Sequence, residues 1–188
     1  MSVEAVILAA GFSSRAKTYK MTLKIDGKTV IERAIESMLK FSSRVIVVGG
    51  YKIENLKPIV KKYESVELVF NEEFEKGMFS SIKRGFSCIK GENFFFMPGD
   101  YPLIGDMVCL ELLKHKKSEI VIPTYKGKKG HPVLIKANLA KELLQSDKYS
   151  NLRDFINDKK PIFVPVGNEG ILLDIDTIED YEKILALS

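Results

Sequence analysis

Short apolar segments alternate with amphipathic stretches along nearly the whole chain, and this alternation limits the possible folds more than any other feature of the sequence. Residues 3–8 and 44–48 are rich in β-branched side chains, which is typical of buried strands. Between them, apolar residues from Ile31 to Leu39 recur at the spacing of a helix packed on one face. Strands and helices in alternation predict βαβ units and a mostly parallel sheet covered on both faces. The chain is therefore predicted to have an α/β fold.

The same patterns predict the remaining elements. A capping-box pattern, Thr29-x-x-Glu32, marks the start of the first helix. Residues 53–63 are expected to be helical, with Pro58 acceptable only in the first turn. Further strands are expected at residues 66–70, 93–97, 120–123, 133–135, 162–166 and 171–174. Further helices are expected at residues 79–88, 106–115, 137–144 and 152–157, with a last helix from residue 178.

The composition predicts a globular protein with one domain over residues 1–188. Hydrophobic residues make up 45% and charged residues 29%, which leaves ample material for a core. The net charge of +4 suits a small anionic substrate and is too small to indicate nucleic acid. The densest basic cluster, Lys126, Lys128 and Lys129, is interpreted as a solvated loop.

The sequence also bears on the compartment. No apolar run approaches the roughly 18 residues that a membrane span requires, and the first run is too short for a signal peptide. Cys88 and Cys109 lie far apart in apolar helical patterns and are interpreted as reduced, buried thiols. Reduced thiols are typical of a reducing compartment. We therefore expect a cytoplasmic protein without a membrane or nucleic-acid partner.

Residues at the carboxyl ends of the strands are the first candidates for function, because ligands of open α/β sheets bind there. A loop of small residues runs from Leu8 to Arg15, with Lys20 five residues further on. Small residues let backbone N–H groups approach a phosphate closely, and the two cations would add charge beside a triphosphate. The loop matches neither GxxxxGK[ST] nor GxGxxG. A plain turn with basic surface residues would explain the same sequence.

Acidic residues follow two other predicted strands. Asp100 stands after Gly99 at a strand end, where one carboxylate can hold Mg²⁺ together with waters and phosphate oxygens. Asp174 and Asp176 are two residues apart, so a strand would turn both carboxylates to the same side. One of them would complete a metal site opposite Asp100, and the sequence does not decide which. The alternative is a turn aspartate at position 100 and capping of the last helix around Thr177.

Two further segments offer polar groups to a ligand. Residues 75–81 open a helix, where free N–H groups together with Ser80 and Ser81 can read a base edge or a phosphate. Ordinary capping by Ser80 would explain the same residues. His131 stands between Gly130 and Pro132 and is a candidate for contact with an acceptor, although a turn histidine is the simpler interpretation.

The order of these segments resembles that of the molybdenum-cofactor guanylyl- and cytidylyltransferases, a superfamily of nucleotidyltransferases. The similarity spans nearly the whole chain and rests on five segments: Leu8-Ala9-Ala10-Gly11-x-Ser13-x-Arg15 with Lys20, Gly77-Met78-x-Ser80-Ser81, Gly99-Asp100-x-Pro102-Leu103, Gly130-His131-Pro132, and Asp174-Ile175-Asp176-Thr177. The first two segments resemble the cytidylyltransferase branch. The chain departs from the family pattern at Ala16-Lys17, Lys24 and Phe79.

The resemblance implies a Rossmann-like three-layer α/β/α sandwich of the nucleotide-diphospho-sugar transferase type. It implies transfer of CMP from CTP to the phosphate of molybdopterin, with Mg²⁺ as cofactor and pyrophosphate as leaving group. The implied partners are an NTP, with CTP favoured, a phosphorylated acceptor such as molybdopterin, and a molybdoenzyme or its maturation chaperone. The implied catalytic residues are Lys20, Arg15 and Asp100, and the implied metal ligands are Asp100, Asp174 and Asp176. Nucleotide binding is assigned to Leu8, Ala9, Ala10, Gly11, Gly49, Gly77, Met78, Ser80, Ser81, Pro98 and Gly99, and acceptor binding to His131 and Pro102.

Other functions remain open at this point. A nucleotidyltransferase of this kind could use GTP or act on a sugar phosphate or a phospho-alcohol. A glycosyltransferase would usually place a D-x-D motif at the end of a central strand, whereas the D-x-D of this chain lies near its C-terminus. A domain that binds nucleotide or cofactor without turnover would have less need of Arg15, Lys20 and Asp100 together.

Overall fold

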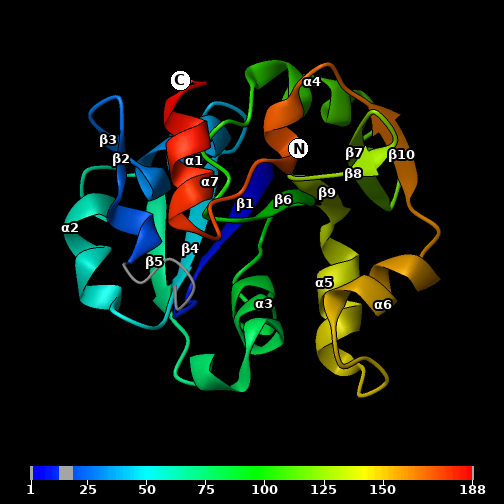
Figure 1. Ribbon diagram of the computed structural model, residues 1–188. Coiled ribbons are helices and arrows are strands. Elements are labelled where there is room, and N and C mark those ends of the chain that lie inside the picture. Colours follow the sequence, from blue (N-terminus) through cyan, green and yellow to red (C-terminus); the bar gives the residue numbers. More distant parts are fainter. Residues whose placement is uncertain (1, 13–18, 188) are drawn as a thin grey trace.

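The computed structural model describes residues 2–12 and 19–187. Its strands, within these ranges, are β1 (Val3–Ala9), β2 (Lys24–Ile25), β3 (Lys28–Thr29), β4 (Arg44–Gly49), β5 (Val66–Phe70), β6 (Asn93–Pro98), β7 (Ile120–Tyr125), β8 (Lys128–Lys129), β9 (Val133–Lys136) and β10 (Ile162–Pro165). The main sheet has the order β10-β7-β9-β6-β1-β4-β5, with β8 paired to β7 (Figure 1). Strands β2 and β3 form a separate hairpin.

The central strands run parallel. Strand β1 pairs in parallel with β4 on one side and with β6 on the other, and β5 and β10 are also parallel to their neighbours. Strand β9 is antiparallel to both β6 and β7. The mostly parallel sheet expected from the sequence is thus confirmed, and β9 is the strand that interrupts it.

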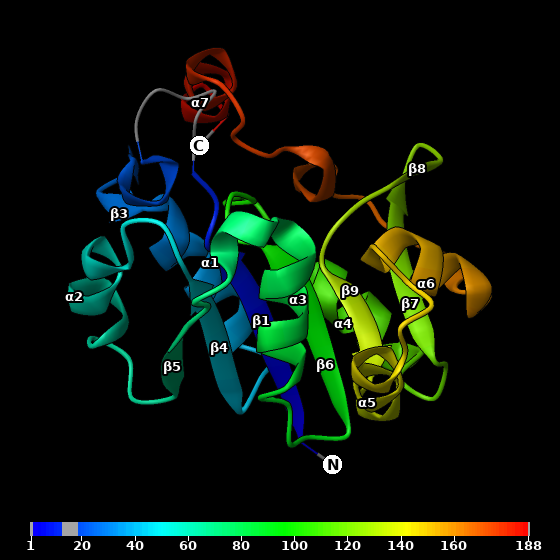
Figure 2. The same cartoon turned by 90° about the horizontal axis from the view of Figure 1, so that it is seen from below.

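Helices cover both faces of the sheet. One face carries α1 (Val30–Leu39), α2 (Lys57–Val60) and α4 (Asp106–Lys114), and the other carries α3 (Met78–Phe86), α5 (Ala137–Gln145) and α6 (Leu152–Asp158) (Figure 2). Alternation along β1 sends Ala5 and Ile7 into the first core, and Val6 and Leu8 into the second. The fold is therefore the expected three-layer α/β/α sandwich. Among the helices of the described ranges, none is both long and apolar enough to cross a bilayer.

A small third core packs the β2–β3 hairpin against the C-terminal helix. Ile25 and Val30, from the β2–β3 hairpin and the start of α1, pack against Ile175 and Ile184 beside the final helix α7 (Ile178–Leu185). The Tyr181 hydroxyl also donates a hydrogen bond of 2.5 Å to the Lys24 carbonyl oxygen. This core ties α7 to the hairpin that follows the 3₁₀ helix η1 (Lys20–Thr22), and Figure 1 shows the C-terminal helix beside that N-terminal region.

Two expected elements are wrong. Residues 171–174 were predicted as a strand, but η4 (Glu169–Leu172) is a 3₁₀ turn. The chain passes so close to the Leu103 carbonyl oxygen that a Cβ on Gly170 would lie 1.9 Å from it, so Ile171 reaches the core from a turn. Residues 53–63 were predicted as one helix and instead form η2 (Ile53–Asn55) and the short α2, whose first turn contains Pro58.

The cysteines differ from each other. Both Cys88 and Cys109 are free thiols, as expected. Cys109 is fully buried on α4, whereas Cys88 is only half-buried because it follows the last turn of α3. The prediction of two buried thiols is therefore correct for Cys109 alone.

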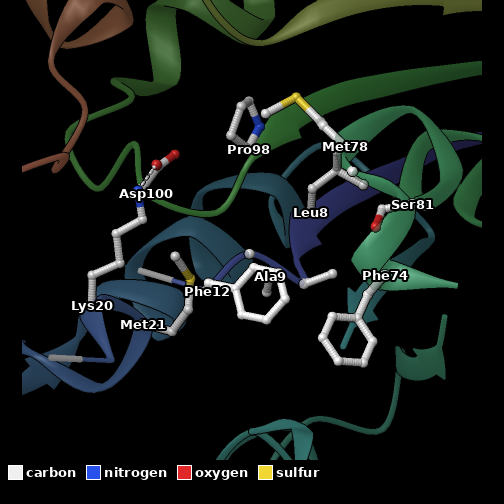
Figure 3. A pocket seen from close by; sticks show the side chains of 13 residues that line it. Leu8, Ala9, Phe12, Lys20, Met21, Phe74, Met78, Ser81, Pro98 and Asp100 are labelled. Atoms are coloured by element: carbon white, nitrogen blue, oxygen red, sulfur yellow. Dashed lines mark hydrogen bonds and ion pairs between the residues drawn. The ribbon is translucent and has the colours of Figure 1, made fainter. Parts of the chain in front are cut away.

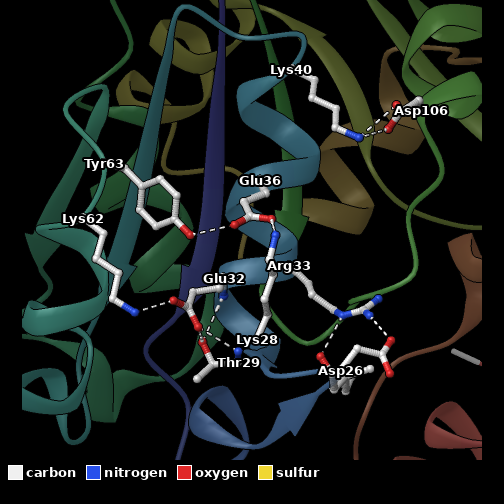
Figure 4. A network of polar contacts seen from close by, with 11 residues as sticks. Asp26, Lys28, Thr29, Glu32, Arg33, Glu36, Lys40, Lys62, Tyr63 and Asp106 are labelled. Carbon is white, nitrogen blue, oxygen red and sulfur yellow. Dashed lines mark hydrogen bonds and ion pairs between the residues drawn. The ribbon is translucent and has the colours of Figure 1, made fainter.

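A polar network fastens the β2–β3 hairpin to α1 and to α2 (Figure 4). The capping box is present, since Glu32 accepts hydrogen bonds from the backbone and side chain of Thr29 and donates its own N–H back to the Thr29 hydroxyl. Lys62 pairs with the second oxygen of Glu32 at 2.6 Å. Burial alone would raise the pKa of Glu32, but the bonds from Lys62 and Thr29 outweigh it and lower the pKa to about 2.

We expect Glu32→Gln to lower the free energy of unfolding at pH 7 by on the order of 2 kcal/mol. The pKa of Glu32 is depressed in the folded state from 4.5, so its stabilising effect is present above pH 4.5 and is lost as the pH falls toward about 2. The deficit of the variant should therefore shrink over that range in urea unfolding. Glu54→Gln is the matched control, because Glu54 pairs with Lys57 at the exposed surface and should change stability little. An equal deficit at pH 7 and pH 2.5 would contradict this account.

Candidate functional site

The site lies where the strand order reverses. From β1 the chain proceeds to β4 and β5 on one side, and then returns to β6 on the other side of β1. Connections that leave two adjacent strands in opposite directions open a crevice at their carboxyl ends. The Gly99 N–H donates to the Leu8 carbonyl oxygen at 2.8 Å and holds the two strand ends together. A first pocket of about 270 Å³ occupies this crevice (Figure 3).

The first pocket combines small residues with two aromatic rings. Its walls come from the end of β1, the start of α3 and the end of β6. Gly77 has a φ of 96°, a left-handed conformation that favours glycine, and it allows the chain to turn sharply into α3. Phe12 and Phe74 lie with ring centroids 5.4 Å apart and cover one side. The predicted residues that line the pocket are Leu8, Ala9, Ala10, Gly11, Lys20, Gly77, Met78, Ser81, Pro98 and Asp100.

Three carboxylates gather beside this pocket. Asp100 follows β6, and Asp174 and Asp176 lie between η4 and α7, with one oxygen of each within 4.8 Å of the others. The Ile175 N–H donates to the Asp100 carbonyl oxygen at 3.1 Å and thereby joins the two segments. The carboxylates converge although residues 171–174 do not form the strand from which their common orientation was predicted.

Lys20 reaches into the acidic cluster from η1. Its ammonium lies 2.5 Å from Asp100 Oδ2 and 3.3 Å from Asp176 Oδ1, and Figure 3 shows the contact with Asp100 at one side of the pocket. The other oxygen of Asp100, Oδ1, is buried and has no hydrogen-bond partner among the described residues. Burial raises the pKa of Asp174, the charges of Asp100 and Asp176 raise it further, and Lys20 lowers it. The cluster therefore carries more negative charge than Lys20 offsets.

The cluster fits a divalent cation. Carboxylate oxygens are the ligands that Mg²⁺ and Mn²⁺ prefer, and the buried Asp100 Oδ1 offers a free acceptor. Counted over the described residues alone, three ionised carboxylates and one ammonium leave two negative charges, which one divalent cation would offset. Removal of the repulsion among the carboxylates would favour its binding.

A second pocket, of about 450 Å³, shares Lys20, Met78 and Asp100 with the first. Tyr101 and His131 form its far wall, with their rings edge to face at a centroid distance of 4.9 Å. Burial lowers the pKa of His131 to about 4, although a backbone hydrogen bond at Phe96 opposes the shift. His131 is therefore neutral at pH 7 and contributes no charge to a ligand.

A third and larger pocket, of about 850 Å³, opens beyond Tyr101 and His131. Its walls are mainly apolar and come from α3, β6, β7, β9 and α6: Met78, Phe79, Ile82, Phe96, Ile122, Val133, Leu152 and Ile156. Lys129 and Arg153 add two cations to the lining, beside one carboxylate, Asp154. The interpretation of the Lys126–Lys129 cluster as a solvated loop is thus incomplete, because Lys129 lines a pocket.

Several predicted site residues lie elsewhere. Gly49 faces Ile53 and Leu68, where a Cβ would lie 2.7 Å from the Ile53 side chain. Ser80 points away from the first pocket into a surface depression beside Lys83 and Arg84. Neither Gly99 nor Pro102 is among the lining residues of the three pockets described above. Arg15 lies outside the residues that the structure describes.

The lining residues that sequence reasoning overlooked include Phe12, Phe74, Tyr101 and Arg153. All three aromatic residues lie close to the carboxyl ends of strands β1, β5 and β6. A single aromatic residue in a loop of small residues is the sequence signal that would have identified Phe12, whose side chain is 48% exposed in the structure. Arg153 stands on α6 after the capping residue Asn151 and offered no comparable signal.

The fold and the site define a class of α/β protein with a nucleotide-sized crevice beside a candidate metal centre. Residues 5–162 match the family model described as MobA-like NTP transferase domain, and the chain belongs to this family of nucleotidyltransferases.

Two relatives of the chain are named for the transfer of different nucleotides. The chain is 27% identical over 180 residues to the molybdenum cofactor cytidylyltransferase of Escherichia coli (strain K12), covering 96% of this chain and 94% of that protein. It is 26% identical to a probable molybdenum cofactor guanylyltransferase of Methanosarcina acetivorans, covering 98% and 90%. Among solved structures, a nucleotidyl transferase from Methanothermobacter thermautotroptrophicus has a TM-score of 0.86 at 21% identity, covering 99% and 97%.

Asp174→Asn should stabilise the protein in EDTA at neutral pH and weaken its stabilisation by divalent cations. The raised pKa of Asp174 means that the folded state holds this proton more tightly than the unfolded chain. Its contribution to stability is therefore best at low pH and falls as the pH rises through the raised pKa. Asparagine removes that penalty together with one metal ligand.

Thermal unfolding from pH 4 to pH 8, with EDTA or with Mn²⁺, would measure both effects. The exposed Asp147 supplies the control Asp147→Asn, which should behave like the wild type. A full cation-induced shift in Asp174→Asn would rule out Asp174 as a ligand.

Proposed function

We propose that the protein transfers CMP from CTP to the phosphate of molybdopterin and releases pyrophosphate. The observation that carries this proposal is the continuity of the three pockets across the acidic cluster. Met78 and Pro98 line all three, so ligands in the first and third pockets would meet beside Asp100. That arrangement suits a donor nucleotide on one side and an acceptor on the other.

The nucleotide occupies the first pocket in this proposal. The small residues that line it at the end of β1 allow a phosphate to approach the backbone closely. Lys20 would neutralise charge that builds on the β- and γ-phosphates. The Escherichia coli relative and the resemblance of the Ala9-Ala10-Gly11 segment to the cytidylyl branch support CTP over GTP.

The acceptor occupies the second and third pockets. Its phosphate would lie near Tyr101 and the acidic cluster, and its body against the apolar walls of the third pocket. A flat ring system such as a pterin would bury apolar faces and keep its polar edge near Lys129 and Arg153. The apolar wall of the third pocket, with these two cations at its edge, supports molybdopterin as the acceptor in this proposal.

The proposed reaction is an in-line displacement at the α-phosphorus. An acceptor phosphate oxygen forms a bond to the α-phosphorus while the bond to the bridging oxygen of the leaving pyrophosphate breaks. The nucleophile is already ionised at neutral pH, so no general base is required. Asp100, Asp174 and Asp176 would hold Mg²⁺, which supplies charge neutralisation at the reacting phosphates when bound. The chain itself contributes positioning and charge stabilisation.

The setting of the reaction follows from the same proposal. The free thiols of Cys88 and Cys109 suit a reducing compartment, and we propose the cytoplasm. A molybdoenzyme or its maturation chaperone would receive the finished cofactor. Membership of a nucleotidyltransferase family weighs against the glycosyltransferase alternative, and the acidic cluster beside Lys20 weighs against a domain that only binds.

Thermal unfolding with CTP, GTP, ATP and UTP, each with Mg²⁺ or with EDTA, tests the donor. A ligand at 100 times its Kd adds about 2.7 kcal/mol, which raises the midpoint by several degrees in a chain of this size. We expect a Mg²⁺-dependent shift that is largest with CTP. A larger shift with GTP would keep the nucleotidyl transfer and remove the cytidylyl assignment. No shift with any nucleotide, alone or with acceptor present, would contradict the nucleotide site.

Asp100→Asn and Lys20→Ala should each lower turnover by about 10²–10³-fold, because each removes a charge that acts on the reacting phosphates. Pyrophosphate release from CTP with molybdopterin is the measurement, and unfolding in the presence of Mg²⁺ checks that the variants fold. Lys83→Ala is the matched control, because Lys83 lies on the outer side of α3 against Phe79. Near-normal turnover in Asp100→Asn would exclude Asp100 from the metal site.

A further inference from the structure

Asn71, which no motif of the sequence singled out, contacts Ser81 of the first pocket and also lines the surface depression beside Lys83 and Arg84. It follows the last residue of β5, and its side chain is buried, with 4% of the residue exposed. Its backbone N–H donates to the Gly49 carbonyl oxygen at 2.9 Å, so the residue is fixed to the end of β4. Asn71 is not among the residues that line the first pocket, and its contact with a ligand there would be indirect.

Every polar group of the Asn71 amide is engaged. The Glu73 N–H donates to Asn71 Oδ1 at 3.1 Å, and a backbone N–H can only donate, so the oxygen must face Glu73. The nitrogen therefore faces α3, where it donates to the hydroxyl oxygens of Ser80 and Ser81, both at 2.9 Å. An amide nitrogen carries two protons, and both are used.

The two serines differ in what they do with their own protons. The Ser80 hydroxyl lies 2.8 Å from the carbonyl oxygens of Glu73 and Gly77 and donates to the backbone. The Ser81 hydroxyl is buried, with 3% of the residue exposed, and lines the first pocket. Among the described residues it has no acceptor for its proton, while Asn71 occupies one of its lone pairs. Donation toward the pocket is then the favoured role of the Ser81 hydroxyl.

We infer that Asn71 is a positioning residue that makes Ser81 a hydrogen-bond donor and thereby selects a base with an acceptor at that point. The inference rests on the proposed function, in which the first pocket holds the base. Cytosine presents the acceptor N3 where uracil carries an N–H, and guanine presents the acceptor O6 where adenine carries an amino group. A donor at Ser81 favours the first member of whichever pair it contacts.

Replacement of the Asn71 amide by a carboxylate should turn the Ser81 hydroxyl from a hydrogen-bond donor into an acceptor toward the ligand. In Asn71→Asp, a carboxylate can only accept, so it takes the proton of Ser81 and leaves that hydroxyl to accept from the ligand. The added negative charge weakens all four nucleoside triphosphates alike, so it cancels in the ratio of affinities within a pair. A merely structural role of Asn71 would also weaken both members of a pair alike.

The experiment is calorimetric titration of CTP, UTP, GTP and ATP with Mg²⁺ into the wild type, Asn71→Asp, Ser81→Ala and the double variant. In the pair that the wild type discriminates, we expect Asn71→Asp to lower the affinity ratio by about ten- to a hundredfold. Ser81→Ala should also lower the ratio, and Asn71→Asp in that background should change it no further. Ser80→Ala is the control and should leave the ratio as it is, because its proton serves the backbone.

The outcomes separate this inference from the proposed function. A wild type that discriminates guanine from adenine overturns the cytidylyl assignment, and the GTP:ATP ratio then tests Asn71. An unchanged ratio in Asn71→Asp, or a wild type without preference in either pair, overturns the inference. If Asn71→Asp fails to fold, Ser81→Ala decides, and full discrimination without the Ser81 hydroxyl overturns it.

Discussion

Repulsion among the carboxylates of Asp100, Asp174 and Asp176 is the constraint around which the functional end of the molecule is arranged. One oxygen of each lies within 4.8 Å of the others, and burial makes the repulsion harder for solvent to screen. Lys20 offsets part of it through its contacts with Asp100 and Asp176. Every segment that meets at this point must therefore be held by interactions elsewhere in the fold.

The interactions that stabilise these segments lie outside the acidic cluster. Lys20 comes from η1 and Asp176 from the approach to α7, 156 residues apart, and the small core of Ile25, Val30, Ile175 and Ile184 packs the two segments together. The Glu32 capping box and its bond with Lys62 then fasten the same hairpin to α1. Apolar burial and a charge-assisted network thus offset a repulsion that would otherwise separate the segments. Stability away from the site is what permits an unfavourable charge arrangement within it.

The sequence predicted those features that depend on local pattern. The period of the apolar residues located most strands and helices, Thr29 and Glu32 marked the start of α1, and Asp100 was expected at the end of β6. Whether a residue lines the pocket depends on long-range packing, which the local pattern of apolar residues does not encode. Gly49 ends a strand as expected, yet it faces Ile53 and Leu68 and is not among the residues that line the first pocket.

The convergence of the three carboxylates was predicted in part for the wrong reason. Alternation in a strand was to align Asp174 with Asp176, but that segment is not a strand. The hydrogen bond from Ile175 to Asp100 and the burial of Ile175 orient the two carboxylates instead. The three aspartates were sufficient to suggest metal binding. Their arrangement could not be predicted, because it depends on the contact between the Asp100 segment and the segment before α7.

The same distinction applies to the choice of base. A serine hydroxyl can donate or accept, so Ser81 in the first pocket does not by itself specify a ligand. Its polarity is set by a neighbour behind the wall, and that neighbour is in turn oriented by a backbone N–H that cannot reverse. Two relatives with identical pocket linings could therefore prefer different bases if the residue at position 71 differed. Base preference in such a pocket is a property of the hydrogen-bond chain that ends at the ligand, and a comparison limited to lining residues would miss it.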